Sequence, residues 1–276
     1  MRKQEICIYG SGAVGKSACL ATLFKLQEQK DLRLIFLAAD ANAFSGLMWG
    51  IKHYNIELQP NQLIFSEVKA KTKKAFSAKL SAFKSFSEGT GKDAYQVGKD
   101  SSANRSKYTY LVSIIEKLEK FSGIDYVTKE EINLGNIADL SSNDILCIDG
   151  LSPISHGIWN LIQGDKLVND QNDYQIVQKQ IYDISQELIN STSCSVIMLA
   201  HEEVTKDNKI RIALGAGQAL HGKYNGLWTN VIYAYKTNAG GYFWSGKKMN
   251  VADIAARDFP EQDGLKPDFS LYNFFS

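Results

Sequence analysis

EICIYGSGAVGKS occupies residues 5–17 and decides how the rest of the chain can be interpreted. The apolar run Ile6–Tyr9 predicts a short buried strand, and Gly10–Ser17 matches the pattern G-x-x-x-x-G-K-[ST]. In such a loop the glycines let backbone N–H groups face a phosphate, and the lysine ammonium offsets the remaining negative charge. A strand before the loop and a helix after it, expected from Lys16 to about Gln29, predict a nucleotide site. A Gly-rich turn without a ligand is the alternative.

Two oxygen donors indicate where Mg²⁺ would bind. Ser17 has a hydroxyl group, and the buried run Ile145–Ile148 ends in Asp149, in the order expected of a Walker B element. An Asp at a strand end could instead cap the next turn. Gly150 follows Asp149, so an acidic base at that position is absent and the base must lie elsewhere. The residues expected to contact ATP are Gly10, Ser11, Gly12, Ala13, Val14, Gly15, Lys16, Ser17 and Ala18.

Short apolar runs alternate with helical patterns, which predicts an α/β fold with a mostly parallel central sheet. Strands are expected at residues 5–9, 33–39, 144–148, 195–200 and 230–235. A crossover helix is expected over Asp173–Asn190, because apolar side chains recur there at helical spacing. They are Tyr174, Val177, Ile181, Ile184 and Leu188. The Gly240-Gly241 pair predicts a C-terminal antiparallel hairpin at the sheet edge.

Composition points to a single globular unit. The 276 residues are 44% hydrophobic and 22% charged, which fits one domain over residues 1–276 and excludes fibrous and disordered classes. No apolar run approaches the roughly 20 residues of a membrane-spanning helix, and no signal peptide is evident, so we expect a cytoplasmic protein. The cysteines stand in apolar surroundings without disulfide-like spacing and are expected to be reduced. They are Cys7, Cys19, Cys147 and Cys194.

Residues 69–107 do not continue the alternation of apolar strands and helical patterns. Ten Lys or Arg and three Asp or Glu give this stretch a local charge of +7, within a chain of net charge +1. Its middle, Ser87–Lys92, is rich in turn formers, and a helical pattern resumes over Tyr108–Phe121. We therefore expect a basic insertion over residues 69–139 rather than a second domain. Its lysines either bind an anionic partner or only keep a helix pair solvated.

Together, the phosphate loop and Asp149 resemble those of the RecA-type branch of P-loop ATPases. Within that branch, the chain is similar to short phage-type proteins of single-strand annealing and recombination, which contain little more than the ATPase core. The resemblance covers Gln4–Ala43 and Ser142 to about Phe259. It implies a RecA-like P-loop NTPase fold, ATP hydrolysis with Mg²⁺ as cofactor that is slow or DNA-stimulated, and a homo-oligomer in the form of a ring or filament.

The resemblance also implies roles at two strand ends. In RecA-type proteins the strand after the phosphate loop ends in Asp-Ala-Glu, whose Glu polarises the attacking water, and here Asn42 occupies the Glu position. Because an amide cannot take a proton, either Asp40 is the base or hydrolysis is slow. His201 follows the predicted strand at 195–200, where such proteins have a γ-phosphate sensor. A turn cap is the alternative for Asp40, and a capped strand end is the alternative for His201.

Single-stranded DNA is the macromolecular partner that the resemblance implies. Loops at residues 151–172 and 204–229 correspond to loops that face DNA in RecA-type proteins. The cations expected to bind phosphates are Lys206, Lys209, Arg211 and Lys223. Tyr224 or Trp228 could stack on bases, or the loop could be solvated with Trp228 in the core. Arg257 resembles the arginine that reaches a neighbouring subunit's γ-phosphate, and a solvated surface arginine is its alternative.

Three functions remain open from the sequence. The first is a DNA-dependent ATPase of recombination, annealing or replication. The second is an ATP-gated protein-binding switch or helicase-loader-like factor. The third, a small-molecule kinase, is disfavoured because the chain shows no Asp-Arg acceptor pattern and no Arg-rich lid. For the apolar stretch at residues 271–275 the sequence allows two positions: it docks either on its own core or on a neighbouring subunit.

Overall fold

The computed structural model describes residues 1–26, 31–40, 42–68, 114–163, 171–205, 211–213, 222–247, 252 and 254–275. Its strands are β1 (Glu5–Gly10), β2 (Arg33–Ala38), β3 (Leu63–Glu67), β4 (Phe121–Asp125), β5 (Glu131–Gly135), β6 (Asp144–Asp149), β7 (Ser195–Val204), β8 (Arg211–Ala213), β9 (Asn230–Lys236), β10 (Tyr242–Ser245) and β11 (Ala255–Ala256). Its helices are α1 (Lys16–Cys19), α2 (Ala43–His53), α6 (Leu151–Gln163) and α7 (Gln171–Ser191), with 3₁₀ turns η1 (Leu20–Lys25), η2 (Ile137–Asp139) and η3 (Phe269–Leu271).

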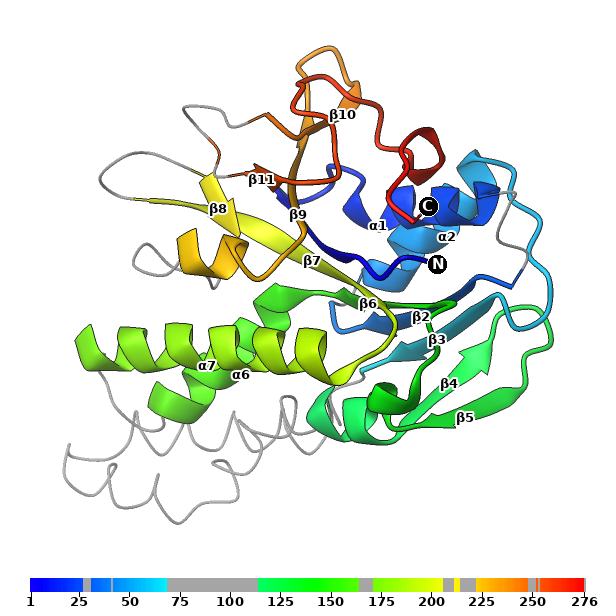
Figure 1. Cartoon of the computed structure of the whole chain (residues 1–276), viewed down its shortest axis with the longest axis horizontal. Coiled ribbons are helices and arrows are strands. Elements are labelled where there is room, and N and C mark those ends of the chain that lie inside the picture. The colour runs from blue at the N-terminus through cyan, green and yellow to red at the C-terminus, as the bar shows by residue number, and fades with distance from the viewer. Residues whose placement is uncertain are drawn as a thin grey trace, which may run out of the picture.

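One sheet joins the strands of the described residues, in the order β10-β9-β1-β7-β6-β2-β3-β4-β5 (Figure 1). The neighbours from β9 through β3 are parallel, and β4, β5, β8, β10 and β11 pair antiparallel. The predicted α/β fold, with a mostly parallel sheet and an antiparallel hairpin at its edge, is therefore confirmed. β7, which contains the predicted sensor, lies between the phosphate-loop strand and the Asp149 strand.

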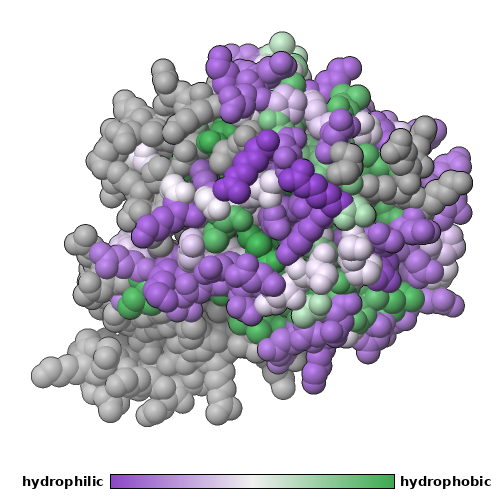
Figure 2. Space-filling view, in the orientation of Figure 1, coloured by the Kyte–Doolittle hydropathy of each residue, from purple (hydrophilic) through white to green (hydrophobic). Residues whose placement is uncertain are grey.

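Helices cover both faces of this sheet, so the molecule has three layers (Figure 1). On one face α6 and α7 pack on the core that includes Val196 and Met198. On the other face α1, α2 and the C-terminal segment pack on a second core that includes Ile197 and Leu199. The alternation along β7 is that of a strand buried on both sides. Hydrophilic side chains cover the outward side of α7, and apolar patches on this view are small (Figure 2).

Several local expectations were wrong in extent. The α-helix after the phosphate loop ends at Cys19, and the chain continues as the 3₁₀ turn η1 to Lys25. In this turn Thr22 Oγ1 donates to the Cys19 carbonyl at 2.6 Å, a bond that competes with the backbone hydrogen bonds of an α-helix. β7 extends to Val204 because β8 pairs with its last residues. Most of the expected loop at 151–172 is helix α6. On α7, Tyr174 is exposed and contacts Trp159 edge-on instead of facing the core.

The insertion expected at residues 69–139 is described only from residue 114 onward, and residues 69–113 lie outside the described part. Residues 114–119 are helical, and β4 and β5 then extend the sheet beyond β3. All four cysteines are buried and free, as expected. Of the helices described, none has the length and hydropathy to cross a bilayer.

Candidate functional site

The phosphate loop connects β1 to α1 at the carboxyl edge of the sheet. Gly15 has a φ of +83°, a conformation that favours glycine, and it directly precedes α1. The Lys16 side chain is buried and folds back across the loop, where Nζ donates to the carbonyls of Gly10 at 2.9 Å and Ser11 at 2.7 Å. The lysine ammonium therefore lies inside the loop where a phosphate would bind.

Asp149 meets the first turn of α1. It is the last residue of β6, it is buried, and its Oδ2 accepts a hydrogen bond from Ser17 Oγ at 2.5 Å. Burial raises the pKa of the Asp149 carboxyl group, and the Ser17 hydroxyl and the Lys16 ammonium lower it in part. The two predicted magnesium ligands are thus adjacent in the fold although 132 residues separate them in the sequence.

The residues present fit a magnesium ion. Ser17 and Asp149 bring a hydroxyl and a carboxylate oxygen together, and Mg²⁺ prefers hard oxygen ligands. In the described part of the chain no three His, Cys, Asp or Glu side chains cluster to hold a metal. A magnesium ion here would complete its shell with phosphate oxygens and water, as it usually does in nucleotide sites.

Burial also lowers the pKa of the Lys16 ammonium, which Asp149, Glu202 and Asp40 raise through their charges. Desolvation therefore disfavours the charged forms of both Lys16 and Asp149 in the free protein. A polyanion that binds Lys16, together with a divalent cation beside Asp149, would compensate both groups.

Asp40 and His201 lie together at the same edge. Asp40 follows β2, and its Oδ2 lies 3.3 Å from Nε2 of His201, which belongs to β7. His201 is opposite Gly10 in the parallel pairing of β1 and β7, and the Asp40 amide donates to the Asp149 carbonyl at 2.8 Å. The fold thus brings a carboxylate and an imidazole beside the phosphate loop. Asp40 Oδ1 also accepts from the Asn42 amide at 3.4 Å, so the turn-cap interpretation of Asp40 has support as well.

Asn42 lies at the start of α2 and is exposed, and its side chain makes no capping hydrogen bond there. α2 itself packs unusually close to α1. A Cβ at Gly46 would lie 2.9 Å from Ser17 Cβ, and one at Gly50 would lie 2.2 Å from the Ala18 carbonyl oxygen. These two glycines were not predicted as site residues, although their spacing of four within an amphipathic helix was a detectable signal.

Arg211, one of the predicted DNA-binding residues, already has an acidic partner. Its Nη1 donates to Glu202 Oε1 at 2.6 Å, and its guanidinium lies 6.0 Å from the centre of the Tyr233 ring. The hydrogen bond to Glu202 is the main cause that raises the pKa of Arg211. Glu202 was also missed as a site residue, because nothing in the sequence indicates that β8 would return beside it.

The other predicted DNA-binding residues are less well placed. Lys206 and Lys209 lie outside the described residues, and Lys223 is exposed at the start of a helical turn over residues 222–225. Tyr224 and Trp228 are fully buried, so the expectation that they stack on bases is wrong and the core interpretation of Trp228 is confirmed.

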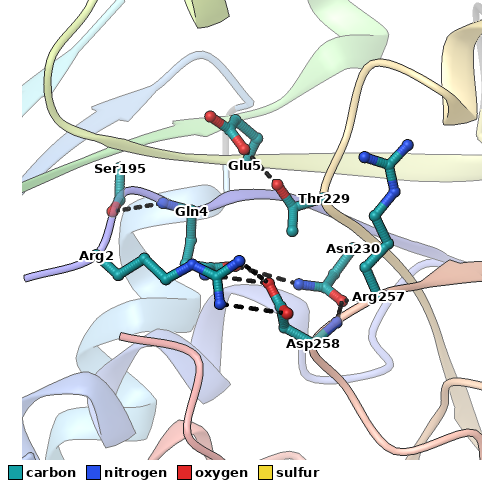
Figure 3. Close-up of polar contacts among 8 residues, drawn as sticks. All are labelled: Arg2, Gln4, Glu5, Ser195, Thr229, Asn230, Arg257 and Asp258. Carbon is teal, nitrogen blue, oxygen red and sulfur yellow. Dashed lines mark hydrogen bonds and ion pairs between the residues drawn. The ribbon is translucent and has the colours of Figure 1, made fainter. Parts of the chain in front are cut away.

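Arg257 lies at the opposite edge of the sheet from the phosphate loop. β11 pairs with the beginning of β9, and the amides of Arg257 and Asp258 each donate to Asn230 Oδ1 at 3.0 Å. Asp258 also binds Arg2 at 3.1 Å, whereas the Arg257 side chain points away from this network (Figure 3). Arg257 therefore cannot serve the nucleotide site of its own chain, and its predicted role requires a neighbouring copy.

No family model matches the chain, and no curated protein matches it in sequence. Among solved structures, it is similar to a type III secretion ATPase of pathogenic bacteria, with 8% identity and a TM-score of 0.41 over 86% of this chain and 51% of the other. It is also similar to the type III secretion ATPase EscN from enteropathogenic E. coli, with 10% identity and a TM-score of 0.41 over 86% and 42%. A KaiC-like protein from Pyrococcus horikoshii OT3 has 11% identity and a TM-score of 0.35 over 89% and 79%.

The chain thus spans about half the length of the secretion ATPases. These likenesses concern the fold alone, and nothing about the chemistry of this chain follows from them. The strand order and the phosphate loop of the chain itself define its fold.

Proposed function

We propose that this chain binds MgATP at the phosphate loop and hydrolyses it. The observation that carries the proposal is the contact between Ser17 and Asp149, 2.5 Å apart beside a loop that holds the Lys16 ammonium. Mg²⁺, when bound, offsets phosphate charge and polarises the terminal phosphoryl group. Lys16 would exchange its contacts with two carbonyl groups for contacts with phosphate oxygens, which are stronger acceptors.

Asp40 and His201 would act on the reacting end of the nucleotide. His201 lies opposite Gly10 and would donate to the γ-phosphate as charge develops there. The Asp40 carboxylate, 3.3 Å from that imidazole, would orient the attacking water and accept its proton. Asn42, exposed at the start of α2, could only orient water.

The first prediction tests nucleotide binding. Lys16→Ala removes the ammonium from a loop built around it, so ATP affinity should fall by more than about 100-fold. Lys52→Ala, on the exposed side of α2, is the control and should leave the affinity unchanged. Nucleotide titration of both folded variants makes the measurement. A Lys16→Ala protein that binds ATP as tightly as the wild type would remove the basis for the phosphate site.

We further propose that the ATPase acts with single-stranded DNA, in a phage-type recombination, annealing or replication process. Support comes from the course of the chain after the sensor candidate. After His201, β7 continues to Val204. The next residues in the sequence include Lys206 and Lys209, and the chain pairs with β7 again from Arg211 in β8. Cations thus follow the sensor candidate closely in the sequence, and DNA bound by them would be coupled to the nucleotide.

The second prediction concerns the salt dependence of DNA binding. Each phosphate contact on a single strand steepens the slope of log affinity against log salt by about 0.7, so replacing Lys206, Lys209 and Arg211 together by Gln should flatten it by roughly 2. Because Arg211 is paired with Glu202, Arg211→Gln alone should flatten it least. Titrations with a homopolymeric strand and ATP at several salt concentrations measure these slopes.

The alternative is an ATP-gated switch or loader that binds a protein partner. Two observations favour it: an amide stands at position 42 where an acid would speed hydrolysis, and Arg211 is occupied by Glu202. If the wild-type protein with ATP shows no single-strand binding at low salt, the DNA proposal fails and the switch is preferred.

A homo-oligomer, as a ring or filament, is the assembly that we propose for either function. Arg257 is exposed at the edge opposite the phosphate loop, so head-to-tail contact between two copies would present it to the next nucleotide site. An arginine from a neighbouring copy would stabilise charge on the transferred phosphoryl group.

A further inference from the structure

The β9–β10 hairpin contacts the phosphate loop at both of its ends. At the first end, a Cβ on Gly10 would lie 2.0 Å from the Ala234 carbonyl oxygen of β9. At the last end, a Cβ on Gly15 would lie 3.6 Å from Cδ1 of Tyr242 in β10. The hairpin is therefore a wall of the nucleotide site, and no side chain from it was among the predicted site residues.

Lys236 lies on the side of this hairpin that faces α1. Along β9, Ala234 and Lys236 share a face because side chains alternate in a strand. Ala234 belongs to the core on the α1 side, and Lys236 extends this face at the carboxyl edge. Lys236 pairs directly with Tyr242 in the antiparallel ladder, and its Nζ lies 5.2 Å from the centre of the Tyr242 ring. The Lys236 ammonium thus lies over the same ring that contacts Gly15.

The balance of charge around the phosphate loop favours a second cation when a nucleotide is bound. Three carboxylates, those of Asp149, Glu202 and Asp40, act on the Lys16 ammonium through their negative charges. A nucleoside triphosphate is polyanionic, and Mg²⁺ would offset only part of its charge. A further ammonium group at the wall of the site would reduce the remaining imbalance.

We propose that Lys236 is a second phosphate-binding cation, which rests on the Tyr242 ring in the free protein and donates to the phosphates of a bound nucleotide. This inference rests on the proposed function of the site. A cation over an exposed aromatic ring is held weakly, whereas an ammonium–phosphate hydrogen bond is charge-assisted at both ends, so the exchange is favourable. Tyr242 keeps the lysine beside the loop, which reduces the rotamer freedom that binding would remove.

The test compares nucleotides that differ in phosphate number. Affinities for ATP, ADP and AMP are measured for the wild type, Lys236→Gln and Lys236→Arg. Lys247→Gln is the matched control, since Lys247 is exposed just beyond the opposite end of β10. Lys236→Gln should weaken ATP binding about tenfold, ADP binding less and AMP binding hardly at all, because the lost charge acts on the phosphates. Lys236→Arg should retain most of the affinity.

Two outcomes would overturn the inference while the proposed function stands. In one, Lys236→Gln binds ATP as the Lys247→Gln control does, while Lys16→Ala abolishes binding. In the other, Lys236→Gln weakens ATP and AMP equally, which would mean a contact to the nucleoside or a change in the fold. A wild-type protein that binds no ATP would overturn both the proposed function and this inference.

Discussion

Asp40 and Asn42 differ in what each can do to a water molecule. A carboxylate can accept a proton, whereas an amide can only orient the water by hydrogen bonds. Asp40 lies 3.3 Å from His201 and beside the Asp149 strand, but Asn42 is exposed at the start of α2. The position of the Asp40 side chain, with its imidazole partner, therefore makes it the better candidate for the base.

The third prediction follows from that difference. Asp40→Asn should lower kcat about 100-fold and leave KM nearly unchanged, because a general base contributes to the transition state and little to binding. His201→Gln should also reduce kcat more than it raises KM. Steady-state ATPase kinetics of these variants and of Asn42→Glu decide the matter. A faster Asn42→Glu enzyme together with an unaltered Asp40→Asn enzyme would show that Asp40 is not the base.

For single strands and helices, the sequence predicted what local patterns encode. Each predicted parallel strand exists in the structure, because a short run of apolar residues is typical of a strand buried on both faces of the sheet in an α/β fold. The meeting of Ser17 with Asp149 follows from the same logic, since both lie where buried strands end at the carboxyl edge. β4 and β5 were missed because Ser122, Gly123 and Asn133 separate their apolar residues, so that neither strand has a continuous apolar run.

Other contacts between distant elements were not predictable from one sequence. The Glu202–Arg211 pair depends on the return of β8 along β7, and the Lys236–Tyr242 pair depends on which strand face is turned toward α1. The position of Arg257 depends on the pairing of β11 with the beginning of β9. In each case the pairing of strands determines where the side chain lies, and local sequence propensity does not.

The fourth prediction concerns the packing of α2 against α1. Gly50→Ala would stabilise an isolated helix by about 1 kcal/mol, because alanine is the better helix former. In this fold the added Cβ would lie 2.2 Å from the Ala18 carbonyl oxygen, so we expect the free energy of unfolding to fall by about 1–3 kcal/mol. Ser45→Ala, at an exposed position of α2, is the control for propensity alone. Denaturant unfolding distinguishes the two effects by their opposite signs.

The C-terminal segment covers the sheet face that bears α1. Its aromatic side chains pack with Trp244, as in the edge-on contact of Phe269 at 5.0 Å. The Phe269 amide donates to Thr22 Oγ1 at 2.8 Å, and Asp268 Oδ2 binds Lys25 Nζ at 2.9 Å. Both partners belong to η1, which continues from α1. Phe274 and Phe275 of the apolar tail, for which the sequence left two possibilities, are buried, so the tail docks on its own core. Through Phe269 and Asp268 the same segment contacts the turn that follows the phosphate loop.

The fifth prediction uses the titration of Asp268. Burial raises the pKa of its carboxyl group. The contacts with Lys25 and Ser270 lower this pKa by more than burial raises it, so the pKa lies below the ordinary value of 3.8. A carboxyl group whose pKa is depressed by folding stabilises the protein above the unfolded pKa, and this contribution is lost as pH falls through the folded pKa. Asp268→Asn should therefore lower the free energy of unfolding by about 1–2 kcal/mol at pH 7. The difference from the wild type should vanish on acidification below the folded pKa.

The control for this measurement is Asp183→Asn, which breaks the exposed ion pair with Lys179 on α7, 2.6 Å long. An exposed pair four residues apart on a helix contributes about 0.3–0.5 kcal/mol, so this variant should change stability little at pH 7. Denaturant unfolding of the three proteins across the acidic range gives the comparison. If Asp268→Asn remains less stable than the wild type by the same amount at the acid end, the Asp268 charge is not what ties the C-terminal segment to η1. The attachment would then depend on the Phe269–Thr22 hydrogen bond and the aromatic core, which do not titrate there.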